Sequence, residues 1–251
     1  MTLPKWNIGS FYKKIRLSKG VTQQKICGST LSRTTLSKFE NNKLVPSYET
    51  MCYLLSQIGM TYEEFGYVCN DYKHDERDEL INSFFHQVSN MDKQFLFSFQ
   101  KRCEIYLQQN DDIFVADVLR ITDSLLNLAE DSIKKIDCLP KIIVSKVWDR
   151  LSKMDMWYYD EIRLINCLLF YFSQDSLLSI SERLLISLER YEEFRPMKVL
   201  RISIVLNLSC LLIQNNKTKN SVELIEKALI WSKEEHRYDY LGIAKVRLGI
   251  C

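Results

Sequence analysis

The stretch Val21–Lys43, VTQQKICGSTLSRTTLSKFENNK, decides the interpretation of this chain. Thr22 and Ser32 each precede a short run with helical spacing, and both are residue types that cap the N-termini of helices. The second run turns Leu36 and Phe39 to one side. The stretch therefore predicts two short helices joined by a loop from Gly28 to Ser32.

More short helices are predicted on both sides of this pair. Apolar residues recur at helical spacing from Ile8 onward, and Gly20 is a residue type that ends a helix in the left-handed conformation. Ser47 and Thr61 can cap two further helices. We therefore expect residues 1–69 to form a domain of five short helices.

This N-terminal part is basic. Residues 1–68 contain nine Lys or Arg and four acidic residues, whereas the remainder contains 25 basic and 28 acidic residues. A small basic domain attached to a slightly acidic body indicates binding to a polyanion. An ordinary solvated surface is the alternative that charge alone leaves open.

The rest of the chain contains few residues that break helices. The chain has 7 glycines in 251 residues, and none lies between Tyr67 and Leu241. Sheet folds need glycine at their turns, so this pattern disfavours a Rossmann domain, a P-loop NTPase and most barrels. We predict an all-α protein, in which a linker at 70–75 leads to a right-handed α-solenoid of TPR-like helix pairs at 76–251.

Three asparagines mark a weak repeat in this body. Asn127, Asn166 and Asn207 each lie in an apolar helical context, 39 and 41 residues apart. Burying an amide without a partner costs about 1–3 kcal/mol, so each side chain needs one. A bound peptide backbone and a neighbouring helix of the fold are both suitable partners.

Several classes of function are disfavoured by what the sequence lacks. It has no GxSxG, HExxH, GxGxxG or GxxxxGK[ST] motif, so we expect no enzyme. The eight cysteines are scattered and the three histidines form no cluster, so we expect buried single thiols and neither metal nor cofactor. No run of 18 apolar residues and no signal peptide is present, which predicts a cytoplasmic protein without a membrane span.

The run Val21–Lys43 resembles the repressor-like (XRE) helix-turn-helix superfamily. Within it, LSRTTLSKFENN (residues 31–42) matches ISKSQLSRFERG of the Rgg/GadR/MutR regulators of Gram-positive bacteria without a gap. The resemblance implies that the second helix of the motif enters the major groove of DNA. It also implies a partly buried ion pair between Arg16 and Glu40.

The candidate DNA-binding residues follow from this register. An arginine at the start of the reading helix can bond a guanine edge at two points, and its neighbours can contact adjacent bases or phosphates. The base-reading candidates are Arg33, Thr34 and Lys38, and the phosphate candidates are Gln23, Asn41 and Lys43. Ser32, Thr35 and Ser37 complete the set.

Two segments of the body also resemble the Rgg-type regulators, namely WYYDEIRLIN (residues 157–166) and VLNL (residues 205–208). In these regulators the solenoid binds a short secreted peptide on its concave face and pairs two subunits. The resemblance implies a peptide site with amide clamps at Asn166 and Asn207. Arg163 and Arg201 are candidates for binding a carboxylate, and Trp157, Tyr159 and Phe170 are candidate groove walls or ordinary core residues.

The resemblance therefore implies a homodimeric transcriptional regulator that binds a palindromic double-stranded promoter and senses a short signalling peptide, as in quorum sensing. The alternative is a helical-repeat module that regulates another protein, with the helix-turn-helix in a secondary role. One departure from the pattern is that the chain stops at Cys251, within a predicted helix, where such regulators continue for some tens of residues.

Overall fold

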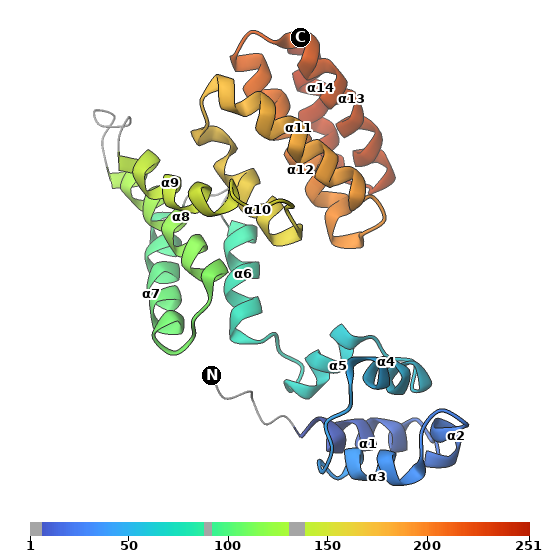
Figure 1. Cartoon of the computed structure of the whole chain (residues 1–251). Coiled ribbons are helices and arrows are strands. Elements are labelled where there is room, and N and C mark those ends of the chain that lie inside the picture. Colours follow the sequence, from blue (N-terminus) through green and yellow to red (C-terminus); the bar gives the residue numbers. More distant parts are fainter. Residues whose placement is uncertain (1–6, 88–91, 131–138) are drawn as a thin grey trace. The chain divides into compact units, whose positions relative to one another are not determined.

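The computed structural model describes residues 7–87, 92–130 and 139–251, and all regular elements in these ranges are helices. This confirms the prediction of an all-α protein. The chain divides into two compact units (Figure 1), one formed chiefly by residues up to His86 and the other chiefly by residues from Gln87 onward.

The first unit contains the five short helices that the sequence predicts, followed by one longer helix. Their bounds are α1 (Ile8–Ser18), α2 (Gln23–Cys27), α3 (Arg33–Glu40), α4 (Tyr48–Gln57), α5 (Tyr62–Cys69) and α6 (Glu76–Gln87). The core of the first five helices includes Tyr12, Ile26, Leu36, Phe39 and Leu54, each at most 1% exposed. The apolar side predicted for the third helix, which carries Leu36 and Phe39, is therefore the side that becomes buried.

The predicted caps begin four of these helices. The hydroxyls of Thr22, Ser32, Ser47 and Thr61 accept backbone N–H bonds of 3.2, 3.0, 3.2 and 3.1 Å at the starts of α2, α3, α4 and α5. Each bond satisfies one of the N–H groups that a helix start leaves without a partner. Gly20 follows α1 with a φ of +67°, as expected for a left-handed stop.

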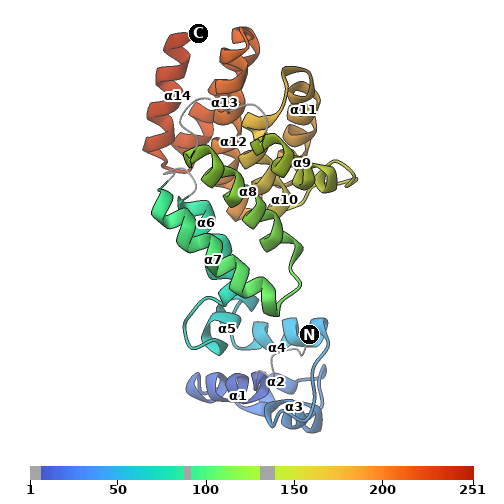
Figure 2. The ribbon, with the colours of Figure 1, turned by 90° about the vertical axis from the view of Figure 1, so that its left-hand side faces the viewer.

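The second unit is built from longer helices. Their bounds are α7 (Lys93–Gln109), α8 (Ile113–Glu130), α9 (Leu139–Leu151), α10 (Tyr159–Leu168), the short 3-10 helix η2 (Leu169–Tyr171), α11 (Gln174–Arg190), α12 (Arg195–Gln214), α13 (Thr218–Glu234) and α14 (Tyr238–Ile250). Helices α8 and α9 pack as one pair and α12 and α13 as another, and α13 also packs on α14. Figure 2 shows this order of helices from a second direction.

Helix α12 is the central helix of the C-terminal part. It contacts α10, α11, α13 and α14, and it is buried on most sides. By length and composition α12 could cross a membrane, but 56% of its most apolar window is buried inside the unit. A helix that is apolar all round and packed between others is typical of a protein core.

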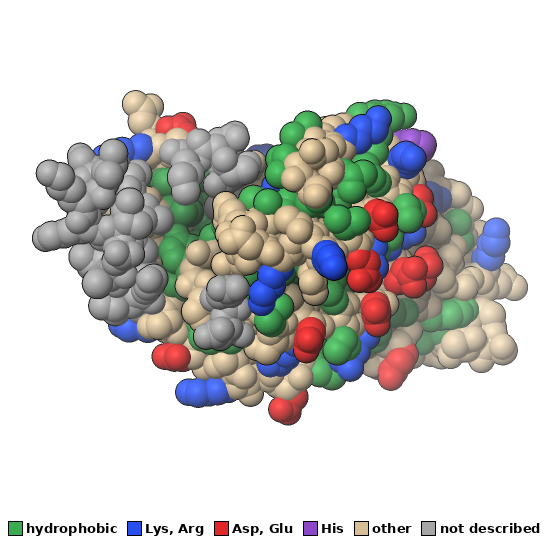
Figure 3. Space-filling model, turned by 90° about the horizontal axis from the view of Figure 1, so that it is seen from above, with side chains coloured by type: hydrophobic (Ala, Val, Ile, Leu, Met, Phe, Trp, Pro, Cys, Tyr) green, Lys and Arg blue, Asp and Glu red, His purple; other side chains and the backbone are tan. Residues whose placement is uncertain are grey.

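The last helix leaves part of its apolar surface uncovered. Val246 is 67% exposed and Ile250 is 63% exposed. Hydrophobic side chains also lie at the surface among charged ones on the face drawn in Figure 3. Isolated apolar residues at a surface are normal, so these exposures define no site on their own.

Two parts of the sequence interpretation stay predictions. The first concerns the domain limits 1–69, 70–75 and 76–251. The division into two compact units does not establish which part of the chain folds independently. The other concerns two helices of the body, for which the spacing of apolar residues predicts the ranges 91–109 and 113–136; residue 91 and residues 131–136 lie outside the described residues.

Candidate nucleic-acid interface and ligand-binding face

Helix α3 presents a polar, basic face to solvent. Ser32 caps its first turn, while Leu36 and Phe39 anchor its opposite side in the core. This geometry leaves Arg33, Thr34 and Lys38 exposed. The three base-reading candidates therefore project from a helix whose orientation is fixed by packing behind it.

The basic side chains of this surface are free of internal partners. In residues 7–87, 92–130 and 139–251, those of Arg33, Lys38 and Lys43 take part in no hydrogen bond or ion pair. Since an exposed cation without an internal partner keeps its full attraction for an anion, the end of α3 and the turn after it are suited to contact a polyanion.

The other members of the candidate set are already engaged within the first unit. The Oγ1 of Thr35 lies 2.8 Å from the Oγ of Ser32, so the two hydroxyls support the cap of α3 together. Asn41 donates from Nδ2 to the carbonyl oxygen of Ser37 at 2.8 Å. Gln23 donates from Nε2 to Oε2 of Glu40 at 2.8 Å. These contacts stabilise α3 and its connection to α2, and any additional DNA contact by these residues stays a prediction.

A buried ion pair joins the first and third helices. Nε of Arg16 lies 2.5 Å from Oε1 of Glu40, and both side chains are at most 5% exposed. Arg16 also donates from Nη2 to Oε2 of Glu40 at 3.0 Å and from Nη1 to the carbonyl oxygen of Val21 at 2.6 Å. The bond to Glu40 raises the pKa of Arg16 above its usual value. The predicted structural role of this pair is confirmed.

In the second unit, two of the three repeated asparagines meet. Nδ2 of Asn207 on α12 donates to Oδ1 of Asn166 on α10 at 3.1 Å, and Nδ2 of Asn166 reaches the Oγ of Ser203 at 3.5 Å. Both amides are half-buried. The two residues are 41 positions apart in the sequence and lie side by side because equivalent helices of successive pairs are neighbours.

The neighbouring candidates on α10 form a mixed charged and aromatic surface. The Arg163 guanidinium lies 5.3 Å from the ring centre of Tyr159 and 3.4 Å from a carboxylate oxygen of Asp160. The Tyr159 ring also meets that of Phe194 at 5.5 Å. Phe170, in η2, is 53% exposed. Of these candidates Phe170 is the most accessible, whereas the side chain of Arg163 is 12% exposed and Tyr159 is half-buried.

Two other candidates are buried in this structure. Trp157 is 2% exposed, and its indole N–H donates to the carbonyl oxygen of Leu151 at 2.8 Å while the Arg183 guanidinium stacks on its ring at 3.8 Å. Arg201 is 6% exposed, stacks on Trp231 at 4.4 Å and reaches a carboxylate oxygen of Glu234 at 3.5 Å. In this state both contribute to helix packing and offer almost no surface to a ligand.

Arg247 is a residue that the sequence interpretation did not single out. From α14 its Nη1 donates to the carbonyl oxygen of Leu206 and lies 3.3 Å from the Oγ of Ser209. These two acceptors flank Asn207 on α12, so the last helix holds the turn that carries this amide. No spacing or motif marks Arg247 in the sequence, because the contact depends on how α14 packs.

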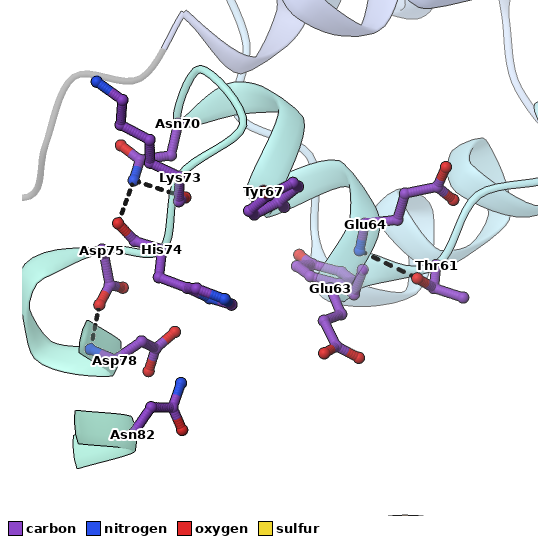
Figure 4. Close-up of a pocket in the computed structure, with 12 residues that line it drawn as sticks. Thr61, Glu63, Glu64, Tyr67, Asn70, Lys73, His74, Asp75, Asp78 and Asn82 are labelled. Atoms are coloured by element: carbon purple, nitrogen blue, oxygen red, sulfur yellow. Dashed lines mark hydrogen bonds between the residues drawn. The ribbon is translucent and has the colours of Figure 1, made fainter. Parts of the chain in front are cut away.

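The first unit also contains an open pocket of about 590 Å³, at the connection from α5 to α6. Figure 4 shows Tyr67 and His74 facing it, with Asn70 bonded to the carbonyl oxygens of Lys73 and His74. Asp75 caps α6 by accepting from the N–H of Asp78 at 2.7 Å. None of the candidate site residues lines this pocket, and its hydrogen bonds serve to shape the connection.

The cysteines differ in exposure more than the sequence suggests. Cys27 and Cys103 are buried as predicted, but Cys52 and Cys251 are exposed, so the prediction was wrong for these two. Burial raises the pKa of the Cys103 thiol to about 12, which makes it a poor nucleophile. Within the described ranges, no three His, Cys, Asp or Glu side chains form a group that could hold a metal ion.

Sequence comparison identifies the family. The pattern of "HTH-type transcriptional regulator Rgg, C-terminal domain" matches residues 100–238, which is more than half of the chain. The chain belongs to the Rgg family of transcriptional regulators. No curated protein sequence matches the chain itself.

Solved structures share the fold of this Rgg-family chain. A protein of Listeria monocytogenes EGD-e classed as a transcriptional regulator has a TM-score of 0.77 at 22% identity, over 97% of this chain and 82% of its own. Rgg2 of Streptococcus dysgalactiae, an SHP pheromone receptor, has a TM-score of 0.69 at 19% identity, over 96% and 85%. PlcR of Bacillus thuringiensis, in complex with the peptide PapR7 and DNA, has a TM-score of 0.64 at 14% identity, over 98% and 86%.

Proposed function

We propose that this Rgg-family regulator reads promoter DNA with α3 and senses a short signalling peptide on the face formed by α10 and α12. It acts as a cytoplasmic homodimer with no catalytic activity of its own. The observation that carries the DNA-reading part is a set of exposed cations, Arg33, Lys38 and Lys43, which have no partner among the described residues and lie on a capped helix and the turn after it.

The chemistry of α3 suits base reading. Arg33 stands at the first helical position, where its guanidinium can bond O6 and N7 of one guanine. Lys38 and Lys43 follow toward the other end of the helix, where phosphates of the DNA backbone are the natural partners. Two such helices in a dimer would read half-sites about one helical turn apart, so a palindromic site is expected.

The peptide-sensing part is supported by the amide pair. After their mutual bond, Oδ1 of Asn207 and one N–H of Asn166 retain hydrogen-bonding capacity. An extended peptide offers one acceptor and one donor per residue, so it can complete both amides. PlcR, whose fold is similar, is in a complex with a peptide and DNA, and Rgg2 is a pheromone receptor, which fits the same role for this chain.

A selection experiment tests the DNA-reading part. Duplexes are selected from a randomised library with the full chain, and the dissociation constants of a selected duplex and a scrambled duplex are measured over a range of salt. We expect a preferred, near-palindromic sequence and an affinity that falls steeply with salt, because several phosphate contacts release counterions. An affinity that is weak, flat with salt and equal for both duplexes would favour the alternative of a regulator that acts on another protein.

A further inference from the structure

Helix α1 begins without a cap from its own flanking residue. Asn7 is of a residue type that caps helices, but its side chain makes no capping bond. In the first turn, the N–H of Ser10 donates to the carbonyl oxygen of Asn7 at 3.0 Å, whereas the N–H of Gly9 needs an acceptor from elsewhere in the unit. Oδ1 of Asn42 supplies that acceptor at 3.0 Å, and it also lies 3.3 Å from the N of Ser10 as a second acceptor for that group.

Asn42 lies directly behind the reading helix. It follows Asn41, the C-cap of α3, and it adopts a left-handed backbone with a φ of +56°. Its own N–H donates to the carbonyl oxygen of Phe39 at 2.8 Å. One residue thus ends α3 through its backbone and caps α1 through its side chain.

The two helices touch at this point through their backbones. A Cβ atom added at Gly9 would lie 1.8 Å from the carbonyl oxygen of Phe39, so no larger residue fits there without moving a helix. Helices α1 and α3 pack against each other in the first unit (Figure 1). Farther along α1, Arg16 binds Glu40 of α3. The last turn of α3 is therefore held at two places along α1.

We propose that Asn42 is a positioning residue for DNA reading, because it fixes the tilt of α3 against α1 and thereby the place of Arg33 in the groove. This inference rests on the proposed function. A helix of 8 residues is about 12 Å long, so a tilt of about 10° at its C-terminal end displaces its start by about 2 Å. Such a displacement exceeds what the hydrogen bonds to a base edge tolerate.

Three variants of the full chain test the proposal. Asn42→Gly keeps the left-handed backbone but removes the acceptor, and glycine stands at this position in the Rgg-type segment ISKSQLSRFERG, so the variant is expected to fold. Asn42→Asp keeps an acceptor oxygen at the start of α1. Asn216→Gly is the matched control, because Asn216 has the same left-handed backbone, with a φ of +57°, after α12 in the second unit.

The measured quantity is the dissociation constant for a scrambled duplex divided by that for a duplex selected by the wild type. Both constants are measured at fixed salt, at a temperature where circular dichroism shows that each variant is folded. A change in non-specific attraction, or in the fraction of folded protein, alters both dissociation constants equally and therefore leaves the ratio unchanged. We expect it to fall about tenfold for Asn42→Gly, on the scale of one lost base contact. We expect Asn42→Asp and Asn216→Gly to stay within about twofold of the wild type.

Each outcome has a defined meaning. An unchanged ratio for Asn42→Gly, with only a lower melting temperature, would make the cap purely structural and overturn the inference. A ratio for Asn42→Asp as low as that of Asn42→Gly would show that the acceptor oxygen is not what matters, and it would overturn the inference as well. A wild type without any sequence preference would instead reject the proposed function.

Discussion

The two candidate sites of this regulator differ in how their functional side chains are held. On α3 the basic groups of Arg33 and Lys38 have no internal partner in the described structure, and the helix beneath them is locked by a cap and a buried ion pair. On α10 and α12 the amides of Asn166 and Asn207 bind each other. The candidate DNA-binding surface therefore presents basic groups that are available to a ligand, whereas the amides of the candidate peptide-binding face already form a hydrogen bond with each other.

This difference has an energetic consequence. Exposed cations lose only hydration and counterions when a phosphate arrives, so their contribution to binding is large and depends on salt. Two amides that already bind each other must exchange that bond for bonds to the peptide, so the gain in binding free energy is only the difference between the two. A hydrogen bond contributes about 1 kcal/mol net, so this difference is small. We therefore expect the loss of a charged group, Arg16 or Arg33, in the first unit to have a larger effect than the loss of either amide.

The largest effect is expected at the ion pair beneath the reading helix. Arg16→Ala leaves Glu40 buried with its charge uncompensated, which should lower the free energy of unfolding of the first unit by about 3–5 kcal/mol. Lys227→Ala is the control, because its pair with Glu223 is exposed and should change the free energy by less than about 0.5 kcal/mol. Denaturant unfolding followed by circular dichroism measures both, and similar losses for the two variants would contradict the comparison.

The next effect concerns sequence reading by Arg33. Arg33→Ala should weaken binding to a selected duplex by about 10- to 100-fold and leave binding to a scrambled duplex nearly unchanged, because a two-point contact to guanine is lost. Arg195, an exposed arginine at the start of α12, provides the control Arg195→Ala. Fluorescence anisotropy with labelled duplexes gives the constants. If Arg33→Ala weakens binding to both duplexes equally, Arg33 contacts a phosphate and does not read a base.

A smaller effect is expected from the cap of the reading helix. Ser32→Ala and Ser173→Ala each remove the hydroxyl that caps a helix, α3 in the first unit and α11 in the second, at a cost of about 1 kcal/mol in stability. Only Ser32→Ala should also weaken binding to the selected duplex. If both variants bind DNA like the wild type, the start of α3 lies outside the interface.

The smallest effect is expected at the amide pair. Asn166→Ala and Asn207→Ala should each lower the free energy of unfolding by about 1 kcal/mol, and the double variant should lose less than the sum, because the two side chains share one bond. A double-mutant cycle from denaturant unfolding measures this coupling. Strictly additive losses would mean that the bond between the two amides contributes nothing in solution.

The sequence predicted the helices well for a physical reason. The starts of α2, α3, α4 and α5 are set by capping hydroxyls, which act within three residues and are visible as Ser or Thr before an apolar run. The end of α1 is likewise set locally, by the left-handed backbone of Gly20. Such local features do not depend on the rest of the fold.

The site was predicted less completely, because its contacts join residues far apart in the chain. The repeat of asparagines indicated Asn166 and Asn207, but two partners were open, and only the packing of α10 on α12 selects their mutual bond. The burial of Arg201 by Trp231 and the cap of α1 by Asn42 depend equally on helix packing. No periodicity in the sequence reports these contacts.

Hydrogen–deuterium exchange of the full chain, with and without a selected duplex, tests the central claim most directly. The account predicts slower exchange on DNA binding in the peptides that cover Ser32–Lys43, and unchanged exchange in those that cover α13 and α14. Slower exchange elsewhere with no change at Ser32–Lys43 would contradict the assignment of α3 as the helix that reads DNA.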